Sequence, residues 1–393
     1  MDIKSRIESY ESYIVDRRRF YHSCPELSEQ EKQTREYLKK DLEEIGITDI
    51  KVMDNCYGMI ATIHGGKPGK TIALRTDTDA LPVHEETGLP FASKNEGVMH
   101  ACGHDCHMSM LLGAARVLNE MKDELSGNVR LLLQPAEEIG TGAKNLIAAG
   151  ALDDVDAVYG AHIWGTVDAP LMDVSAGNRM ASCYRLAIEV EGVSAHASAP
   201  HTGVDAIMVA CTIATSLQQI VSRMNDPVNP LVLTIGTIHG GSRWNVISGH
   251  ASMEGTIRTF AGGPELEERI RKVVTSTAEA LGAKATLEYV PMAMPVINDN
   301  DQLNRIAHDV VVKLYGEEAL AHTPPMMGSE DFAEYRAYNV PSIFGLLGSR
   351  DPSLGHIYSN HHEKYDVNEK LLLRGASIMA QFAYDYLAET AEQ

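Results

Sequence analysis

Short apolar, β-branched runs that alternate with helical segments constrain the fold of this chain most. The runs lie at residues 58–63, 71–74, 129–133 and 157–163, and helical spacing covers residues 107–121 and 143–149. Strand and helix in this order predict an α/β domain with a mostly parallel sheet flanked by helices. Sheets of this kind bind their ligands on loops at the carboxyl ends of the strands.

A second pattern begins at about residue 181. Between residues 181 and 292 the predicted order is strand, helix, strand, strand, helix, strand, which is typical of a small two-layer α+β module with a ferredoxin-like fold. We therefore expect a discontinuous domain, residues 1–180 and 293–393, interrupted by an inserted domain, residues 181–292. The free-edged sheet and long helix of the insert suit association, so we expect a homodimer.

The balance of charges argues against several classes of partner. Lysine and arginine number 34, against 54 aspartate and glutamate residues, which gives a formal net charge of -20. Such a surface would repel nucleic-acid phosphates and anionic lipid, so we expect neither nucleic acid nor a membrane as a partner. A small anionic substrate would need a local positive group, such as a metal ion or an arginine.

The first residues and the cysteines indicate a cytoplasmic protein. The first 20 residues carry charges throughout, without the apolar segment of a signal peptide. Six cysteines in 393 residues do not suggest a disulfide framework. We therefore expect reduced thiols, and a cysteine that lies among histidines becomes a candidate metal ligand.

The densest chemical signal is the sequence MHACGHDCHM at residues 99–108. Thiolate and neutral imidazole are the ligands that zinc and its neighbours prefer. Gly103 permits a tight bend, so that Cys102 and His104 could face one ion. A zinc ribbon is excluded because the chain has no second Cys-x-x-Cys knuckle. The alternative is a buried cluster of cysteine and histidine without a metal.

Three further segments add possible ligands. Glu137 and Glu138 follow an apolar strand, His162 lies near the end of another, and His361 and His362 lie on a predicted loop. Each alone is equally typical of a solvated acidic loop, a core histidine or a surface loop. Together with the thiol and imidazole cluster they suffice for a site with two metal ions and shared ligands.

Several linked motifs carry a family resemblance: RTDTDALP at 75–82, MHACGHDCH at 99–107, QPAEE at 134–138, GAHIWG at 160–165, EGVSAHASAPHTGVDA at 191–206, GSEDF at 328–332 and HHEKYD at 361–366. In this order they resemble the metal-dependent amidohydrolase family of hippurate hydrolase, bacterial N-acyl-amino-acid hydrolases and plant auxin-conjugate hydrolases. Aminoacylase and carboxypeptidase G are more distant relatives.

The resemblance implies a set of site residues. The metal ligands would be Cys102, His104, Glu138, His162 and His361, with Cys102 bridging two divalent ions and His362 as an alternative last ligand. Glu137 would be the catalytic base, and His196 would stabilise the oxyanion, often from the partner subunit. Asn245 and Arg258 would hold the substrate carboxylate. Sulfur favours zinc, and manganese, cobalt and nickel remain open.

The implied reaction is hydrolysis of the amide bond of small N-acyl amino acids, with the inserted domain acting in dimerisation or as a lid. A dipeptidase or carboxypeptidase on the same scaffold is the first alternative, and a non-catalytic metabolite-binding protein is a remote one. The chain departs from the usual family pattern at Thr76, Thr78, Ile139 and the NVISGH segment, residues 245–250. These departures leave the first ligand shell intact and bear on substrate specificity.

Overall fold

The computed structural model describes residues 2–391, which form two compact units. Unit 1 runs to Arg179 and continues over Ile297–Pro324 and from Asp331 onward, whereas unit 2 comprises Met180–Val296 and Pro325–Glu330. The predicted boundaries placed residues 180, 293–296 and 325–330 with the first domain. The structure groups them with unit 2 because the main-chain N–H of Ala181 donates to Met326 at 3.0 Å and Ala293 still pairs with Cys183.

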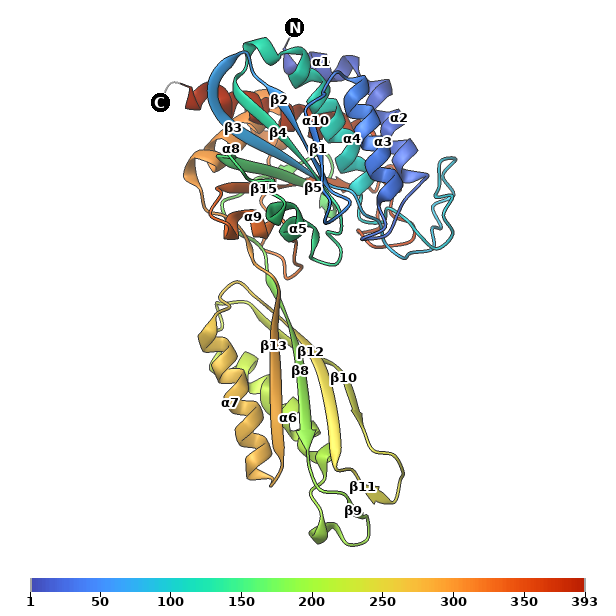
Figure 1. Cartoon of the computed structure of the whole chain (residues 1–393), viewed down its shortest axis with the longest axis vertical. Coiled ribbons are helices and arrows are strands. Elements are labelled where there is room, and N and C mark those ends of the chain that lie inside the picture. Colours follow the sequence, from blue (N-terminus) through green and yellow to red (C-terminus); the bar gives the residue numbers. More distant parts are fainter. Residues whose placement is uncertain (1, 392–393) are drawn as a thin grey trace. The chain divides into compact units, whose positions relative to one another are not determined.

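The sheet of unit 1 confirms the predicted α/β class. Its strands are β1 (Ile50–Val52), β2 (Met59–His64), β3 (Lys67–Asp77), β4 (Ser126–Gln134), β5 (Ala157–Asp168), β6 (Met172–Asp173) and β15 (Ser342–Arg350), in the order β1-β2-β4-β3-β5-β15-β6. The four central strands β4, β3, β5 and β15 run parallel to one another, and the remaining strands pair antiparallel at the two edges (Figure 1).

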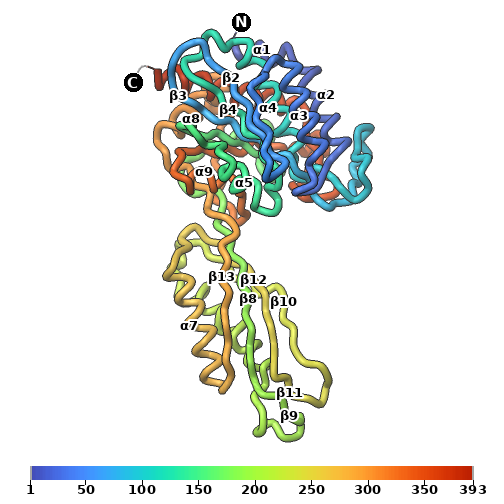
Figure 2. The backbone as a smooth tube through the Cα atoms, viewed as in Figure 1, coloured from blue at the N-terminus to red at the C-terminus, as the bar shows by residue number. Residues whose placement is uncertain are grey.

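Helices cover this sheet. They are α1 (Ile3–Ser9), α2 (Glu11–His22), α3 (Lys32–Glu44), α4 (His104–Glu120), α5 (Gly142–Ala148), α8 (Asp301–Tyr315), α9 (Ala333–Ala337) and α10 (Lys370–Thr390). Helices α4 and α10 pack on each other and on β3, and α1 contacts α10, so both ends of the chain share one core (Figure 2). Along β4, Leu131 and Leu133 face that core while Leu132 is buried outside it, as alternation in a two-sided sheet requires.

Unit 2 has the predicted ferredoxin-like arrangement. Its elements are β8 (Ser182–Glu191), α6 (Ala206–Gln219), β10 (Leu231–Gly240), β12 (His250–Thr259), α7 (Pro264–Ala280) and β13 (Lys284–Ala293). The strands form an antiparallel sheet in the order β10-β12-β8-β13, and apolar residues of α6 and α7 make a separate core with it. A short pair, β9 (Ala195–His196) with β11 (Val246–Ile247), lies outside this sheet.

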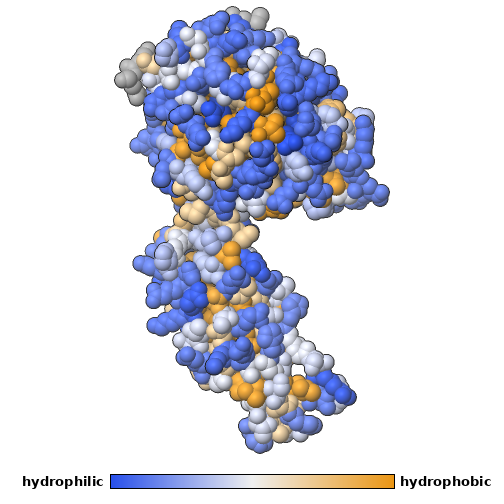
Figure 3. Space-filling model, in the orientation of Figure 1, coloured by the Kyte–Doolittle hydropathy of each residue, from blue (hydrophilic) through white to orange (hydrophobic). Residues whose placement is uncertain are grey.

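The surface of unit 2 carries apolar side chains among polar ones (Figure 3). Met208, Val232, Ile238 and Trp244 are all exposed, and Trp244 is 88% exposed. Over the described residues 2–391, the helices are too short or too polar for any of them to cross a membrane.

Candidate metal centre

Three parallel strands bring the predicted residues of unit 1 together where the carboxyl ends of these strands lie. β3 ends at Asp77 and β4 at Gln134. On β5, Arg75 of β3 pairs with Gly160, so His162 lies level with the end of β3. Beyond these ends the chain continues into Asp79 and into the Glu137–Glu138 pair. The site therefore forms where ligands of parallel α/β sheets are normally bound.

The predicted metal ligands lie around the thiol of Cys102. Its Sγ lies 3.3 Å from Nε2 of His162 and 3.3 Å from Nε2 of His361. Glu138 places Oε2 3.6 Å from His361 Nε2 and Oε1 3.9 Å from His104 Nε2. Three of the groups whose ligand atoms all lie within 4.8 Å of one another contain the predicted ligands: Cys102, His104 and His162; Cys102, Glu138 and His361; His104, Glu137 and Glu138. Cys102 belongs to two of these groups, so one thiolate could serve two cations.

Hydrogen bonds to main-chain carbonyl groups fix which imidazole nitrogens face the cluster. Nδ1 of His104 lies 2.9 Å from the carbonyl oxygen of Asp79, and Nδ1 of His162 lies 2.7 Å from that of Ile163. A carbonyl oxygen only accepts, so each Nδ1 carries a proton, and in the neutral ring each Nε2 presents a lone pair to the cluster. Nε2 of His104 and Oε1 of Glu138 are shielded from solvent and have no hydrogen-bond partner within residues 2–391. Buried acceptors without donors around a thiol fit a cation.

His107 lies in the same segment but is held by other hydrogen bonds. Its Nδ1 donates to Asp77 at 2.6 Å, and its Nε2 accepts the main-chain N–H of Ile163 at 2.9 Å. Asp77 also accepts from Arg75 at 2.6 Å. Because both nitrogens of His107 are used within the protein, we assign this histidine to supporting β5 rather than to binding a cation.

The cluster concentrates acidic groups away from solvent. Burial raises the pKa of the Cys102 thiol well above its usual value, and the Glu138 and Glu137 carboxylates raise it further. Burial also raises the pKa of Glu138, to about 7. For His104, burial disfavours the charged form, but Asp77 and Asp79 outweigh it and raise the pKa to about 10. Positive charge is therefore favoured at this position: without a cation His104 keeps a second ring proton, and a divalent cation at Nε2 would replace that proton.

The loop between β15 and α10 holds His361 against Cys102. His361 has a left-handed backbone, φ 72°, and its N–H donates to Ala101 at 2.8 Å. The preceding Asn360, which the sequence did not single out, donates to the carbonyl oxygens of Cys102 at 2.9 Å and Ile163 at 3.1 Å. The alternative ligand His362 stacks on the Tyr358 ring instead, with centroids 4.2 Å apart. The geometry thus favours His361 over His362.

Two of the three predicted residues of unit 2 lie side by side. His196 pairs with Val246 across the β9–β11 ladder, and the N–H of Ala197 donates to the carbonyl oxygen of Asn245 at 3.2 Å. Ser198 donates its N–H to Nδ1 of His196 at 3.2 Å, so Nε2 of His196 carries the ring proton.

Arg258 lies at the other end of the same unit. It follows His250, the first residue of β12, by eight positions, and it donates to Ser329 at 2.7 Å. At about 3.3 Å per strand residue, roughly 26 Å separate Arg258 from the end of β12 that adjoins His196 and Asn245. Within one chain, the structure therefore does not bring Arg258 and Asn245 to the same small ligand.

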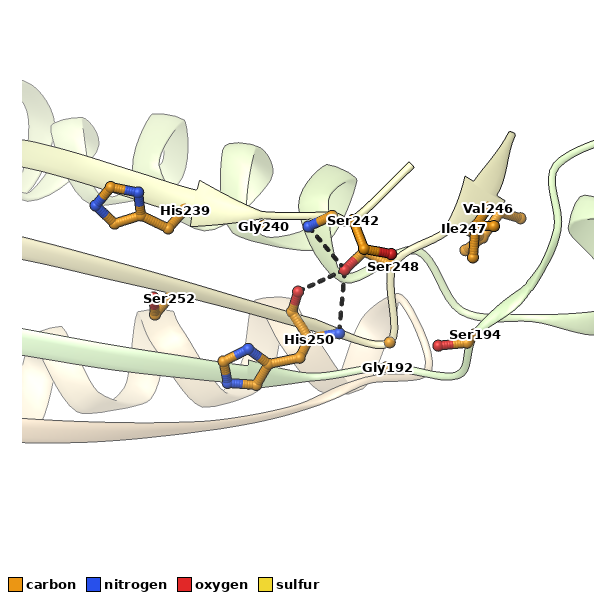
Figure 4. Close-up of a pocket in the computed structure, with 12 residues that line it drawn as sticks. Gly192, Ser194, His239, Gly240, Ser242, Val246, Ile247, Ser248, His250 and Ser252 are labelled. Atoms are coloured by element: carbon orange, nitrogen blue, oxygen red, sulfur yellow. Dashed lines mark hydrogen bonds between the residues drawn. The ribbon is translucent and has the colours of Figure 1, made fainter. Parts of the chain in front are cut away.

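A cavity of about 540 Å³ lies beside β11 in unit 2 (Figure 4). Ser194, His239, Ser248 and His250 line it together with Val246 and Ile247. No carboxylate or thiol is among its lining residues, and His250 is bonded to Glu189 at 2.7 Å. This cavity is therefore separate from the cluster around Cys102.

Comparison with known proteins identifies the family. The profile described as peptidase family M20/M25/M40 matches residues 73–385, most of the chain. The chain belongs to this family. The M20 enzyme is 37% identical over 388 residues to N-acetyl-L-cysteine deacetylase of Bacillus subtilis, covering 98% of this chain and 91% of that protein. It is also 37% identical over 389 residues to thermostable carboxypeptidase 2 of Saccharolobus solfataricus, covering 98% of each chain.

A solved structure shares the whole architecture. A dinuclear metal binding peptidase of the M20 family from Bacillus subtilis superimposes with a TM-score of 0.85 at 34% identity, covering 98% of this chain and 99% of that chain. The family resemblance inferred from the motifs is therefore confirmed.

Asp79 organises the centre of the M20 enzyme, although the sequence analysis gave it no role. It is fully buried, and its two carboxylate oxygens accept the main-chain N–H groups of Glu137 and Glu138, each at 3.1 Å. Burial disfavours its ionisation, but hydrogen bonds from His104 and Ser28 hold the pKa of Asp79 below its usual value. The available signal was a pair of aspartates two residues apart, Asp77 and Asp79, at the end of a buried strand.

Replacing Asp79 by asparagine is expected to weaken metal binding, turnover or both by roughly 10–100-fold, the usual cost of losing a group that orients metal ligands. An amide nitrogen cannot accept the N–H groups that position the glutamates. Competition with a chromophoric chelator and steady-state kinetics would measure the two effects. Ser28→Ala, which removes a single hydrogen bond of 2.7 Å to Asp79, is the matched control and should do much less. Equal behaviour of the two variants would contradict this role.

Proposed function

We propose that this M20 enzyme hydrolyses the amide bond of N-acyl amino acids, such as N-acetyl or N-benzoyl derivatives, and releases a carboxylic acid and a free amino acid. The observation that carries the proposal is the convergence of two imidazoles and a carboxylate on the Cys102 thiol, with Glu137 beside them. Full-length similarity to N-acetyl-L-cysteine deacetylase supports this class of substrate.

The roles of the side chains follow from their positions. Cys102, His104, Glu138, His162 and His361 would hold two divalent cations. Bound cations of this kind lower the pKa of water to about 7 and polarise a carbonyl group. Glu137 accepts the proton of the attacking water and delivers it to the nitrogen of the leaving amine. His196, whose Nε2 carries the ring proton, donates to the developing oxyanion.

Two further proposals concern the metal that is bound and the location of the enzyme in the cell. Sulfur and imidazole in one ligand set favour zinc over manganese, cobalt or nickel. A cytoplasmic location stays a prediction from composition and from the charged first residues.

We propose further that the active enzyme is a homodimer with shared sites. Arg258 and Asn245 lie too far apart in one chain to hold one carboxylate, as the length of β12 requires. In a shared site, the substrate would contact Arg258 of one chain together with the partner subunit's His196 and the partner's Asn245. The exposed Met208, Val232, Ile238 and Trp244 of unit 2 supply apolar surface for such an association.

Mixing two inactive variants tests the shared site. A Glu137→Gln chain and a His196→Ala chain each lack one part of every site in their own homodimers. If equal amounts are unfolded together and refolded, about half of the dimers should contain one chain of each kind. Each mixed dimer should contain one complete site and one that lacks both groups, so about a quarter of wild-type activity is expected. Mixed dimers confirmed by mass spectrometry but without activity would refute the arrangement.

A comparison of substrates tests the proposed reaction. We expect higher kcat/KM for N-acetyl and N-benzoyl amino acids than for dipeptides with the same carboxyl-terminal residue. The similarity to a thermostable carboxypeptidase supports peptides as the second candidate class. A preference for dipeptides would replace the first proposal by the second, and no turnover of either would refute both.

A further inference from the structure

A second cavity of unit 1 lies behind the turn that carries Glu137. Its volume is about 420 Å³, and it is enclosed by the start of α3, the loop before β2 and the Pro135–Ala136 turn. The lining residues that matter are Glu31, Arg35, Asn55, Tyr57, Ala136 and Asn145. None of the proposed metal ligands lines this cavity, so it is a separate site.

Glu31 is a fully buried carboxylate, and only one of its two oxygens accepts a hydrogen bond from the described residues. Its Oε1 accepts the main-chain N–H of Ala136 at 2.8 Å. Its Oε2 is shielded from solvent and has no hydrogen-bond partner within residues 2–391. Burial raises the pKa of Glu31 to about 7. A buried carboxylate oxygen without a donor is rare in folded proteins, and a donor group on a ligand would satisfy it.

Arg35 presents a guanidinium to the same cavity. It lies one helical turn after Glu31, and its guanidinium carbon lies 5.3 Å from the centre of the Tyr57 ring. Its Nε is buried without a hydrogen-bond partner among the described residues, while Nη2 reaches Glu36 at 3.2 Å. A guanidinium restrained in this way is suited to a carboxylate.

The two groups define the ligand. Residues four apart on a helix have Cβ atoms about 5–6 Å apart, a spacing that one small zwitterion can bridge. Glu29 and Asp54 also line the cavity, so acidic groups outnumber the single arginine and favour an ammonium group. We propose that this cavity is a second binding site for a free α-amino acid, with its ammonium at Glu31 and its carboxylate at Arg35.

Occupancy of this site would act on the catalytic turn. Ala136 has a left-handed backbone, φ 52°, directly before Glu137, and Glu31 holds its N–H. A ligand that draws Glu31 toward its own ammonium alters the support of that turn. A free amino acid is also the product of the proposed reaction, so the site would respond to product. This coupling rests on the proposed function, whereas the binding itself does not.

Isothermal titration calorimetry on the full-length, metal-loaded enzyme tests the binding without any need for turnover. Each of the common free amino acids would be titrated, and the strongest binder compared with its decarboxylated amine and its deaminated acid. We expect both analogues to bind at least tenfold more weakly. We also expect a loss of at least tenfold in Glu31→Gln and in Arg35→Met. Glu43→Gln, the same change on an exposed position of α3, is the matched control and should bind as wild type.

Two results would overturn the proposal: no free amino acid binds, or the strongest binder binds both cavity variants as tightly as wild type. If Glu31→Gln does not fold, as judged by circular dichroism, the result for Arg35→Met decides alone, because the Arg35 side chain is partly exposed and its ion pair with Glu36 lies at the surface. Hydrogen exchange reports the coupling separately. Faster exchange of the Ala136 amide on binding, as Glu31 is drawn away from it, supports the coupling, and unchanged or slower exchange contradicts it.

Discussion

Glu137→Gln is expected to lower kcat by roughly 10²–10⁴-fold, the range of a general acid–base group, while both metal ions stay bound. Glu137 and Glu138 are adjacent, and the carboxylate oxygens of Glu138 lie 3.9 Å from Nε2 of His104 and 3.6 Å from Nε2 of His361, which suits Glu138 to be the ligand of the pair. The amide of glutamine keeps the size of the side chain but cannot take a proton from water. The loss should therefore appear in kcat rather than in metal content.

Steady-state kinetics and elemental analysis of the same preparation would separate the two effects. Glu44→Gln on α3, a position that is exposed and pairs only with Lys40, is the matched control. If Glu137→Gln turned over substrate as fast as the wild type, Glu137 would not be the catalytic base. A loss of metal equal to the loss of turnover would make Glu137 a ligand instead.

Cys102→Ser is expected to weaken metal binding by about 100-fold or more, beyond the usual cost of losing an outer-shell partner. Sγ of Cys102 lies 3.3 Å from Nε2 of His162 and 3.3 Å from Nε2 of His361. A serine hydroxyl at the same place is a weaker ligand that stays protonated near neutral pH. Because the thiolate would serve both cations, both stoichiometry and turnover should fall.

Cys106→Ser provides the matched comparison, since this thiol is also buried and lies four residues later, in the first turn of α4. It is absent from the ligand groups around Cys102. Metal content would be measured after dialysis against a chelating buffer. Two ions per chain in Cys102→Ser would refute the shared thiolate.

Much of the fold was predictable because its signals are local. Apolar runs such as 129–133 and 157–163 became β4 and β5, and the change of pattern at residue 181 marked unit 2. The boundary between the units depends on contacts between distant segments. Residues 325–330 join unit 2 through main-chain hydrogen bonds from Ala181 to Met326 and Gly328 and through the bond from Arg258 to Ser329, which no periodicity in the sequence announces.

The site was predictable where residue type alone carries chemistry. Thiol, imidazole and adjacent carboxylates stood out, and the structure places those of unit 1 together. Asp79, Asn360 and Glu31 did not stand out, because each acts through a hydrogen bond to main chain that is distant in sequence. The distance between Arg258 and Asn245 was equally hidden, since it depends on which end of β12 each residue adjoins.

Anomalous X-ray scattering from crystals of the metal-loaded enzyme, recorded above and below the absorption edge of the bound metal, tests the central proposal most directly. We predict two peaks per chain, both about 2.3 Å from Sγ of Cys102 if the metal is zinc. One peak should adjoin His104 or His162 and the other His361, with Glu137 outside bonding distance of both. A single peak, or two peaks that do not share Cys102, would contradict the account.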